Sequence, residues 1–140
     1  MNPVAYDIAV KLASSSLGTV ASTSDWGIYI DALPDQPTNC IVVSDFSSPP
    51  PIVPSSGANP LDRGSFQILV RGSDHSAVFQ KALAISKVLT GLRYKIRESG
   101  KKNVYYRGIV RQSDFTSVAS GVKGVYIRTV SFLALRQETE

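Results

Sequence analysis

The side chains that most often carry catalysis or bind metals are scarce in this chain. It has one histidine, His75, and one cysteine, Cys40. A single histidine cannot form a two-histidine metal site, and a single cysteine can form neither an internal disulfide nor a thiolate cluster. The aspartates before position 92 stand singly, where turns and helix caps are expected. We therefore expect no metal and no cofactor, and we expect Cys40, in the apolar stretch NCIVV, to be a buried strand residue rather than a reactive thiol.

Nucleophilic catalysis and phosphate binding also lack their sequence signatures. Serine is abundant, but none lies in a GxSxG turn, and His75 falls at the start of a predicted helix beside its cap. The stretches GVKG and SGKKN do not have the GxxxxGK[ST] spacing of a phosphate-binding loop. These patterns favour an exposed or capping histidine over a catalytic base. The chain is not expected to be an enzyme.

Basic and aromatic residues concentrate in the C-terminal part of the chain. The net charge is +4, yet residues 93–136 hold ten basic and two acidic side chains, a net +8. This surplus suggests an anionic partner or an acidic surface of another subunit, although a solvated charged face has the same composition. Tyr105 and Tyr106 fall on one predicted strand, as aromatics do in single-strand binders, but alternation sends them to opposite faces, which favours a half-buried sheet. The residues expected to face DNA, if it is bound, are Lys101, Lys102, Arg107 and Arg111.

Two helices are predicted. Asn2 and Pro3 are typical of a helix start, and the apolar residues that follow have helical spacing. A second helix is expected over residues 74–92, capped by Ser73 or Asp74. Its apolar residues recur at steps of four and three, which is the pattern of one buried face. The solvent side is then left to Gln80, Lys81 and Lys87.

The other ordered segments are predicted strands. They lie at 27–32, 40–45, 65–72, 93–98, 104–112 and 125–136. We expect the first two to pair as a hairpin, because prolines and an aspartate separate them. Since strands and helices do not alternate strictly, the prediction is one α+β domain over residues 1–140, with a mixed or antiparallel sheet and two helices packed on one face. The sequence has no signal-peptide pattern and no apolar stretch long enough for a membrane span, so no membrane is expected among its partners.

Residues 46–63 form a long proline-rich loop between two of these strands. Five prolines in eighteen residues are incompatible with a continuous helix or strand. A long irregular segment in a small domain is usually functional or mobile. We interpret it as an arm that orders against a neighbouring subunit, with a plain surface loop as the alternative. It also contains the PxxP spacing of polyproline ligands, a pattern that clustered prolines produce by chance.

Three stretches have distinctive patterns. RGSFQILVRGSDHSAVFQKALAISKVLTGL, at 63–92, is an aromatic–Gln–aliphatic strand that ends in Arg and leads into an alanine-rich helix. ALPDQPTNCIVVSD, at 32–45, is a turn followed by an aliphatic strand, and GVYIRTVSFLAL, at 124–135, is the last predicted strand. These stretches resemble the corresponding segments of bacteriophage tail terminator proteins, also called tail completion or minor capsid proteins. The proline-rich loop and the turn SGKKN depart from the family pattern.

The resemblance implies a structural protein of the virion. Such terminators form a hexameric ring that caps the head-proximal end of the tail tube and joins it to the head connector or stopper protein. The implied partners are further copies of the chain, the tail tube protein and the connector, and DNA passes through the lumen. Assembly would take place in the host cytoplasm. No cofactor or catalysis is involved.

A ring requires surfaces that are exposed in one copy and covered by the next. We expect them in the loops 46–63 and 113–123 and on outward strand faces, where Leu69, Ile109 and Phe132 are expected to be exposed. The full set of expected interface residues is Pro50, Ile52, Val53, Leu61, Arg63, Leu69, Arg71, Phe115, Val118, Arg128 and Phe132. Two alternatives remain open: another neck or head-completion protein, and a basic module that binds nucleic acid.

Overall fold

The order of helices and strands follows the prediction, with two short strands added. The computed structural model describes residues 2–21, 26–46, 49–53, 55, 60–97, 103–118 and 122–139. Its helices are α1 (Val4–Ser14) and α2 (His75–Leu89). Its strands are β1 (Thr19–Val20), β2 (Gly27–Ile30), β3 (Cys40–Asp45), β4 (Asp62–Gly72), β5 (Tyr94–Arg97), β6 (Asn103–Arg111), β7 (Thr116–Val118) and β8 (Tyr126–Thr139). The sequence pattern missed β1 and β7, which are too short to show a periodicity.

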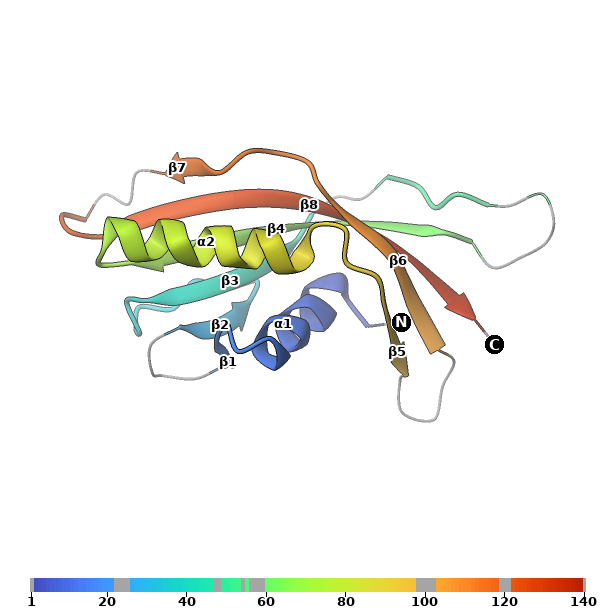
Figure 1. The fold of residues 1–140 in the computed structure, drawn as a ribbon, viewed down its shortest axis with the longest axis horizontal. Helices are drawn as coiled ribbons and strands as arrows, with labels where there is room; N and C mark the ends of the chain where they lie inside the picture. Colours follow the sequence, from blue (N-terminus) through green and yellow to red (C-terminus); the bar gives the residue numbers. More distant parts are fainter. Residues whose placement is uncertain are drawn as a thin grey trace.

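The strands of the described residues form one mixed, eight-stranded sheet. Its order is β1-β2-β3-β4-β8-β6-β5, and β7 pairs with β8 as well. β4 and β8 lie at its centre and pair antiparallel from Asp62↔Arg136 to Gly72↔Tyr126. Both strands are long and curved, and the two helices pack against the same side of the sheet (Figure 1). The predicted α+β class is confirmed.

The predicted hairpin of the first two strands is wrong. β2 and β3 pair in parallel, with Gly27 opposite Cys40 and Ile30 opposite Val43. The chain turns at Asp31, which has a φ of 61°, and residues 31–39 return it to the starting end of β2. Four strand residues span about 13 Å, a distance that nine connecting residues can cover. Prolines and an aspartate between two strands are therefore compatible with either an antiparallel hairpin or a connection that leads to a parallel strand.

The core lies between the helices and one face of the sheet. β4 contributes Phe66, Ile68 and Val70, all fully buried. α2 packs with the face that its spacing predicted, which consists of Val78, Ala82, Ile85 and Leu89. A single cluster of buried side chains joins both helices to the sheet. Burying such side chains is the main favourable contribution to folding, at about 1.5–3 kcal/mol for each large aliphatic or aromatic residue.

The expected exposure of Phe132 and Ile109 is also wrong. Phe132 has no exposed surface and stacks on Phe66 with ring centroids 5.3 Å apart, while Ile109 is 1% exposed. Both point toward the helices. Of the three residues expected on outward strand faces, Leu69 alone lies on the side opposite the helices, where it is half-buried.

The two helices begin in different ways. Of the two predicted caps of α2, Ser73 and Asp74, the structure has Asp74: its Oδ1 accepts a hydrogen bond of 3.3 Å from the backbone N–H of Ser76. Asn2 does not cap α1. The carboxylate of Asp45, at the end of β3, accepts a hydrogen bond of 3.0 Å from the N–H of Ala5 instead. A distant strand therefore supplies a partner that the local sequence was expected to provide.

Lys81 is not left to solvent as expected. Its Nζ donates to the carbonyl oxygen of Leu17 at 3.1 Å and lies 4.8 Å from the centre of the Trp26 ring. Burial lowers the pKa of this amine. The lysine thus connects α2 to the segment that follows α1, in addition to the apolar contacts of the core.

A group of four charged or polar residues, three buried and one partly exposed, fastens α1 to the sheet. We call Asp7, Asp62, Tyr106 and Arg136 the polar clamp. The hydroxyl of Tyr106 donates to Oδ2 of Asp7 at 2.6 Å, and Nε of Arg136 donates to Oδ2 of Asp62 at 2.8 Å. Nη1 of Arg136 also donates to the backbone oxygen of Asn2 at 2.6 Å. The clamp therefore links α1 to the three strands β4, β6 and β8.

Protonation in the clamp is shifted by its surroundings. Burial, followed by the hydrogen bond to Asp7, raises the pKa of Tyr106 far above its ordinary value of about 10. Burial by itself would lower the pKa of Arg136, but the hydrogen bond to Asp62, the interactions with Tyr106 and the charge of Asp62 together outweigh this effect, and the pKa is raised. Tyr106 therefore stays neutral and Arg136 stays charged throughout the physiological pH range.

Candidate assembly surfaces

The described part of the proline-rich segment forms an arm rather than a structureless loop. We use "arm" for residues 49–53 and 60–61. Ile52 and Leu61 exchange two backbone hydrogen bonds, of 2.9 and 2.8 Å, as an antiparallel bridge. The strand β4 begins at Asp62, so the last two residues of the expected loop, 62–63, belong to the sheet. The arm extends from the end of the sheet, away from both helices (Figure 1).

The arm is tied to the sheet and presents apolar side chains. Nε and Nη2 of Arg63 donate to the carbonyl oxygen of Pro50 at 3.0 and 2.7 Å. Ile52 is 48% exposed and Val53 is 74% exposed. Uncharged apolar side chains at this exposure on an ordered projection are typical of a contact surface.

The side chain of Arg71 binds backbone oxygens of the same chain, so its guanidinium is not free for a partner. Its guanidinium donates to the backbone oxygens of Pro37 and Thr38 at 2.8 and 3.0 Å, and to that of Asp35 at 3.4 Å. These bonds fix the connection between β2 and β3. Beside it lies a hollow of about 340 Å³ with an apolar rim, lined by Leu33, Asp35, Gln36, Thr38, Arg71, Val122, Val125 and Ile127. Sequence reasoning missed this hollow, since its walls come from segments about 90 positions apart.

The residues expected around β7 divide into anchors and exposed positions. Phe115 packs edge-on against Phe79 of α2, with ring centroids 6.4 Å apart, and is half-buried. Arg128 lies 5.2 Å from the centre of the Phe79 ring, and its Nη2 is 3.4 Å from Nε2 of His75. Val118 is 41% exposed. Phe115 thus joins the start of β7 to α2, Arg128 joins β8 to α2, and Val118 is available to a partner.

The basic residues expected to face DNA have different surroundings. Lys101 and Lys102 lie outside the described residues. Arg111 is paired with Asp114, with Nη2 and Oδ1 3.4 Å apart. Arg107 instead stacks on Tyr105, with its Cζ 4.8 Å from the ring centre. Arg107 and Arg111 therefore have different partners and do not form one basic site.

A further hollow of about 310 Å³ lies between α1 and β5. It is lined by Asn2, Tyr6, Asp7, Val10, Lys11, Ser14, Tyr94 and Ile96. Tyr6 and Val10 are close to half exposed, on a helix whose other face is buried. Sequence reasoning missed this surface, although the spacing of the two residues by four positions is a signal for a second apolar face on the helix.

In the described part of the chain, the His, Cys, Asp and Glu side chains are not gathered into a metal site. Cys40 is fully buried, and burial raises the pKa of its thiol despite the lowering effect of Arg71. His75 is exposed and contacts the ring of Tyr126, with centroids 5.3 Å apart. Within the described ranges, no three His, Cys, Asp or Glu side chains gather as a metal site requires. The same residues include no helix with the length and apolarity to cross a membrane.

Comparisons with known proteins relate the chain to a virion component by its fold. No protein-family model matches the chain, and no curated protein matches its sequence. A chain of a solved structure described as the virion of a native gene transfer agent (GTA) particle has a similar fold, with a TM-score of 0.58 and 16% sequence identity. The match covers 98% of this chain and 96% of that chain. The likeness therefore extends over nearly the full length of both chains.

Proposed function

We propose that this protein is a structural component of a phage-like virion, and specifically a tail terminator. The observation that carries the proposal is the match, over nearly the full length of both chains, to a chain from a gene transfer agent virion. The sequence resemblance to tail terminators at residues 32–45, 63–92 and 124–135 supports the finer assignment. Within the described residues, Cys40 is buried and no group of metal-ligating side chains gathers, which is consistent with a role in assembly.

The shape of the molecule supports contact between opposite ends of neighbouring copies. In Figure 1 the arm lies at the end where β4 begins, and β8 begins at the opposite end of the sheet. The hollow lined by Leu33 and Val122 also includes Ile127, so it lies where β8 begins. The eleven paired residues of β4 and β8 separate these ends by about 35 Å. Contacts between two different surfaces generate a ring when the rotation between copies closes. A hexamer is the ring that we propose.

The ring would cap the head-proximal end of the tail tube and bind the head connector or stopper on its other side. The outer sheet face is available for such contacts. Leu69, Leu133 and Leu135 lie there half-buried, and Val110 is 53% exposed. Among the described residues, both helices pack on the opposite face, so neither covers this one.

Measurement of mass alone and in mixtures tests the proposal. The purified chain, or the chain mixed with the tail tube protein of the same genome, is expected to form rings of about six copies by native mass spectrometry and negative-stain microscopy. Added before polymerisation, it is expected to restrict tubes to one capped end. A chain that stays monomeric alone and with the tube protein contradicts the proposal. Binding to the connector without binding to the tube identifies another neck protein instead.

A further inference from the structure

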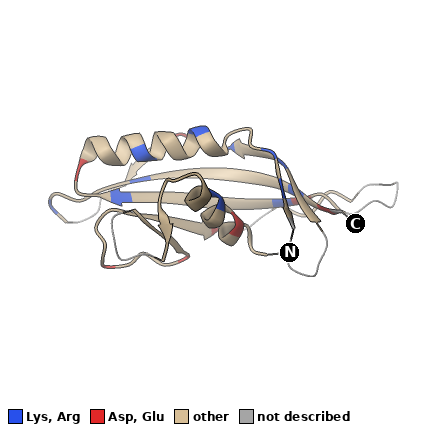
Figure 2. Cartoon of the chain, turned by 60° about the horizontal axis from the view of Figure 1, so that its bottom comes forward, with Lys and Arg blue, Asp and Glu red and all other residues tan. Residues whose placement is uncertain are grey.

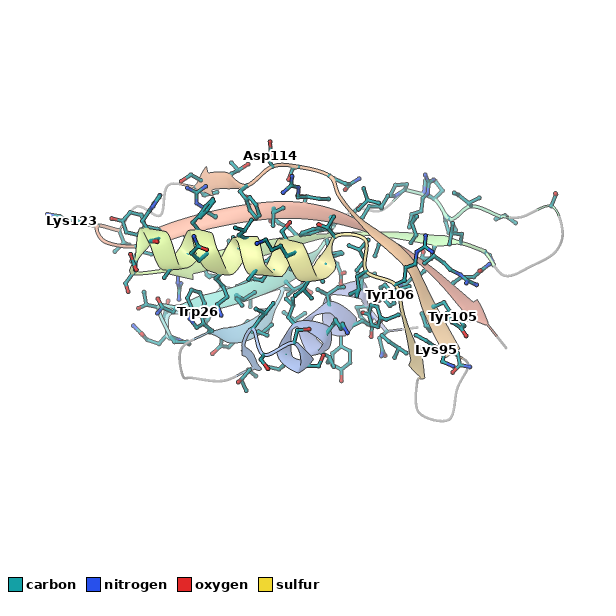
Figure 3. All side chains as sticks on the ribbon, viewed as in Figure 1. Trp26, Lys95, Tyr105, Tyr106, Asp114 and Lys123 are labelled. Atoms are coloured by element: carbon teal, nitrogen blue, oxygen red, sulfur yellow. The ribbon has the colours of Figure 1, made fainter. Side chains whose placement is uncertain are left out.

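A hollow lined by three cations lies on the β5–β6 pair. Its volume is about 400 Å³, and its lining is Arg93, Tyr94, Lys95, Tyr105, Tyr106 and Arg107. The side chains of Lys95 and Tyr105 extend from neighbouring strands near the tip of the β5–β6 pair (Figure 3). Blue segments of the ribbon mark this pair of strands in Figure 2, where few red segments lie beside them. We call Arg93, Lys95, Tyr105 and Arg107 the basic hollow.

Tyr105 positions two of the cations. Nζ of Lys95 lies 5.7 Å from the centre of the Tyr105 ring, and Cζ of Arg107 lies 4.8 Å from the same point. The two cations are therefore within the sum of these distances, about 10.5 Å, of each other. Nη2 of Arg107 also donates to Oε1 of Gln137 at 3.2 Å, which holds the guanidinium in place. Stacking on the ring leaves other N–H groups of this guanidinium directed outward.

Among the described residues, the cations of the basic hollow lack the carboxylate partners that Arg111 and Arg136 have. Arg111 pairs with Asp114, and Arg136 pairs with Asp62. Within the part of the chain that the structure describes, no carboxylate lies within 4 Å of Arg93, Lys95 or Arg107. All three are exposed. Lys95 and Arg107 place two positive charges around one ring, so an anionic ligand that contacts both is attracted by two charges at once.

We propose that the basic hollow binds the phosphate backbone of duplex DNA. Phosphate fits because a guanidinium donates to it in a bidentate fashion and lysine adds a point charge. Base stacking is not favoured, since Tyr94 and Tyr106 stack on each other with centroids 4.7 Å apart and Tyr105 carries its own cations. Binding is therefore independent of sequence and salt-dependent. The site is complete within one copy, so it does not depend on the proposed ring.

Two variants with equal loss of charge test this site. Lys95→Gln/Arg107→Gln removes two cations from the basic hollow. Lys87→Gln/Lys123→Gln removes two exposed lysines elsewhere, and Lys123 lies at the opposite end of the molecule (Figure 3). Binding of a fluorescent 20-base-pair duplex is followed by anisotropy from about 20 to 200 mM salt. The full-length chain is expected to show a slope of log K against log salt near −2.7, about −0.9 for each of three phosphates.

The expected results separate the site from general attraction to a basic protein. The Lys95→Gln/Arg107→Gln variant is expected to bind at least tenfold more weakly at low salt, with a slope smaller by about 1.8, while the Lys87→Gln/Lys123→Gln variant stays within about twofold of the original chain. Equal weakening in both variants overturns the proposal, and so does the absence of binding. Competition by polyglutamate as effective as by DNA at equal charge also overturns it, in favour of an acidic protein partner. Native mass measured on both variants shows separately whether the ring forms.

Discussion

Tyr106 makes the stability of this protein sensitive to alkaline pH. The folded chain keeps the phenolic proton above pH 10, because burial and the bond to Asp7 raise the pKa, whereas the unfolded chain releases it. Unfolding therefore releases a proton, and the free energy of unfolding falls as pH rises above about 10, by up to about 1.4 kcal/mol per pH unit. Below pH 10 this contribution is fully present.

Replacing the tyrosine is expected to flatten this dependence. Tyr106→Phe loses the hydrogen bond to buried Asp7, so we expect it to be less stable than the original chain by about 1–3 kcal/mol at pH 8. Because the phenylalanine has no proton to release, the difference shrinks between pH 10 and 11. Urea unfolding at pH 8, 10 and 11 measures this difference in the free energy of unfolding. Tyr105→Phe, a half-exposed position, is the matched control, and a constant difference for Tyr106→Phe contradicts the explanation.

Arg136 is expected to be the most costly member of the polar clamp to remove. Its side chain neutralises Asp62, at 2.8 Å, and lies 3.7 Å from the oxygen of Asp7 that accepts from Tyr106. Arg136→Met leaves the buried carboxylate of Asp7 without a cation beside it, and we expect the free energy of unfolding to fall by about 3–5 kcal/mol. Thermal and urea unfolding measure the loss. Adding Asp7→Asn is expected to recover part of it, whereas additive losses argue against coupling between the two residues.

At the scale of the elements, the contact between α1 and β4 depends on a glycine. A Cβ at Gly64 would overlap Cγ2 of Val4, so the helix can approach the strand only because Gly64 has no side chain. We expect Gly64→Ala to destabilise the fold by about 1–3 kcal/mol.

The pair Gly64→Ala/Val4→Ala tests this origin. Removing the methyl groups of Val4 makes room for the new Cβ, so the double variant is expected to lose less than the sum of the single losses. Gly108→Ala is the control, because a Cβ there meets nothing within 4 Å, and it is expected to be nearly neutral. If urea unfolding shows that the double variant loses the sum of the two single losses, strand propensity and not the contact with α1 determines the loss of stability in Gly64→Ala.

At the scale of the whole molecule, the proposed ring predicts that copies assemble through contacts between the arm and the opposite end. Ile52→Asp/Val53→Asp places two charges on the exposed side chains of the arm, where no core contact is lost. We expect a folded monomer in place of the ring, with the free energy of unfolding of the single chain within about 0.5 kcal/mol of the original. Native mass spectrometry and circular dichroism measure the two quantities. Val10→Asp/Val20→Asp, at exposed positions on α1 and β1, is the matched control and is expected to keep the ring; loss of the ring in this control alone moves the subunit contact to α1 and β1.

The sequence by itself determined what depends on local periodicity. The steps of four and three in α2, the cap by Asp74 and the alternation of β4 are each set within a few residues, and the structure confirms them. The opposite orientation of Tyr105 and Tyr106 also follows from strand geometry, and Tyr106 is 1% exposed. The α+β class followed from the order of these elements.

Only the tertiary structure decided which strand faces the core and which distant groups meet. Both faces of β8 carry apolar side chains, Phe132 on one and Leu133 on the other, so alternation could not tell the buried face from the open one. The parallel pairing of β2 with β3 and the polar clamp join residues as far apart as Asp7 and Arg136. Such pairings depend on strand register and on burial across the whole chain. Contacts between residues far apart in the sequence produce no local periodicity, so they cannot be predicted from the residues around them.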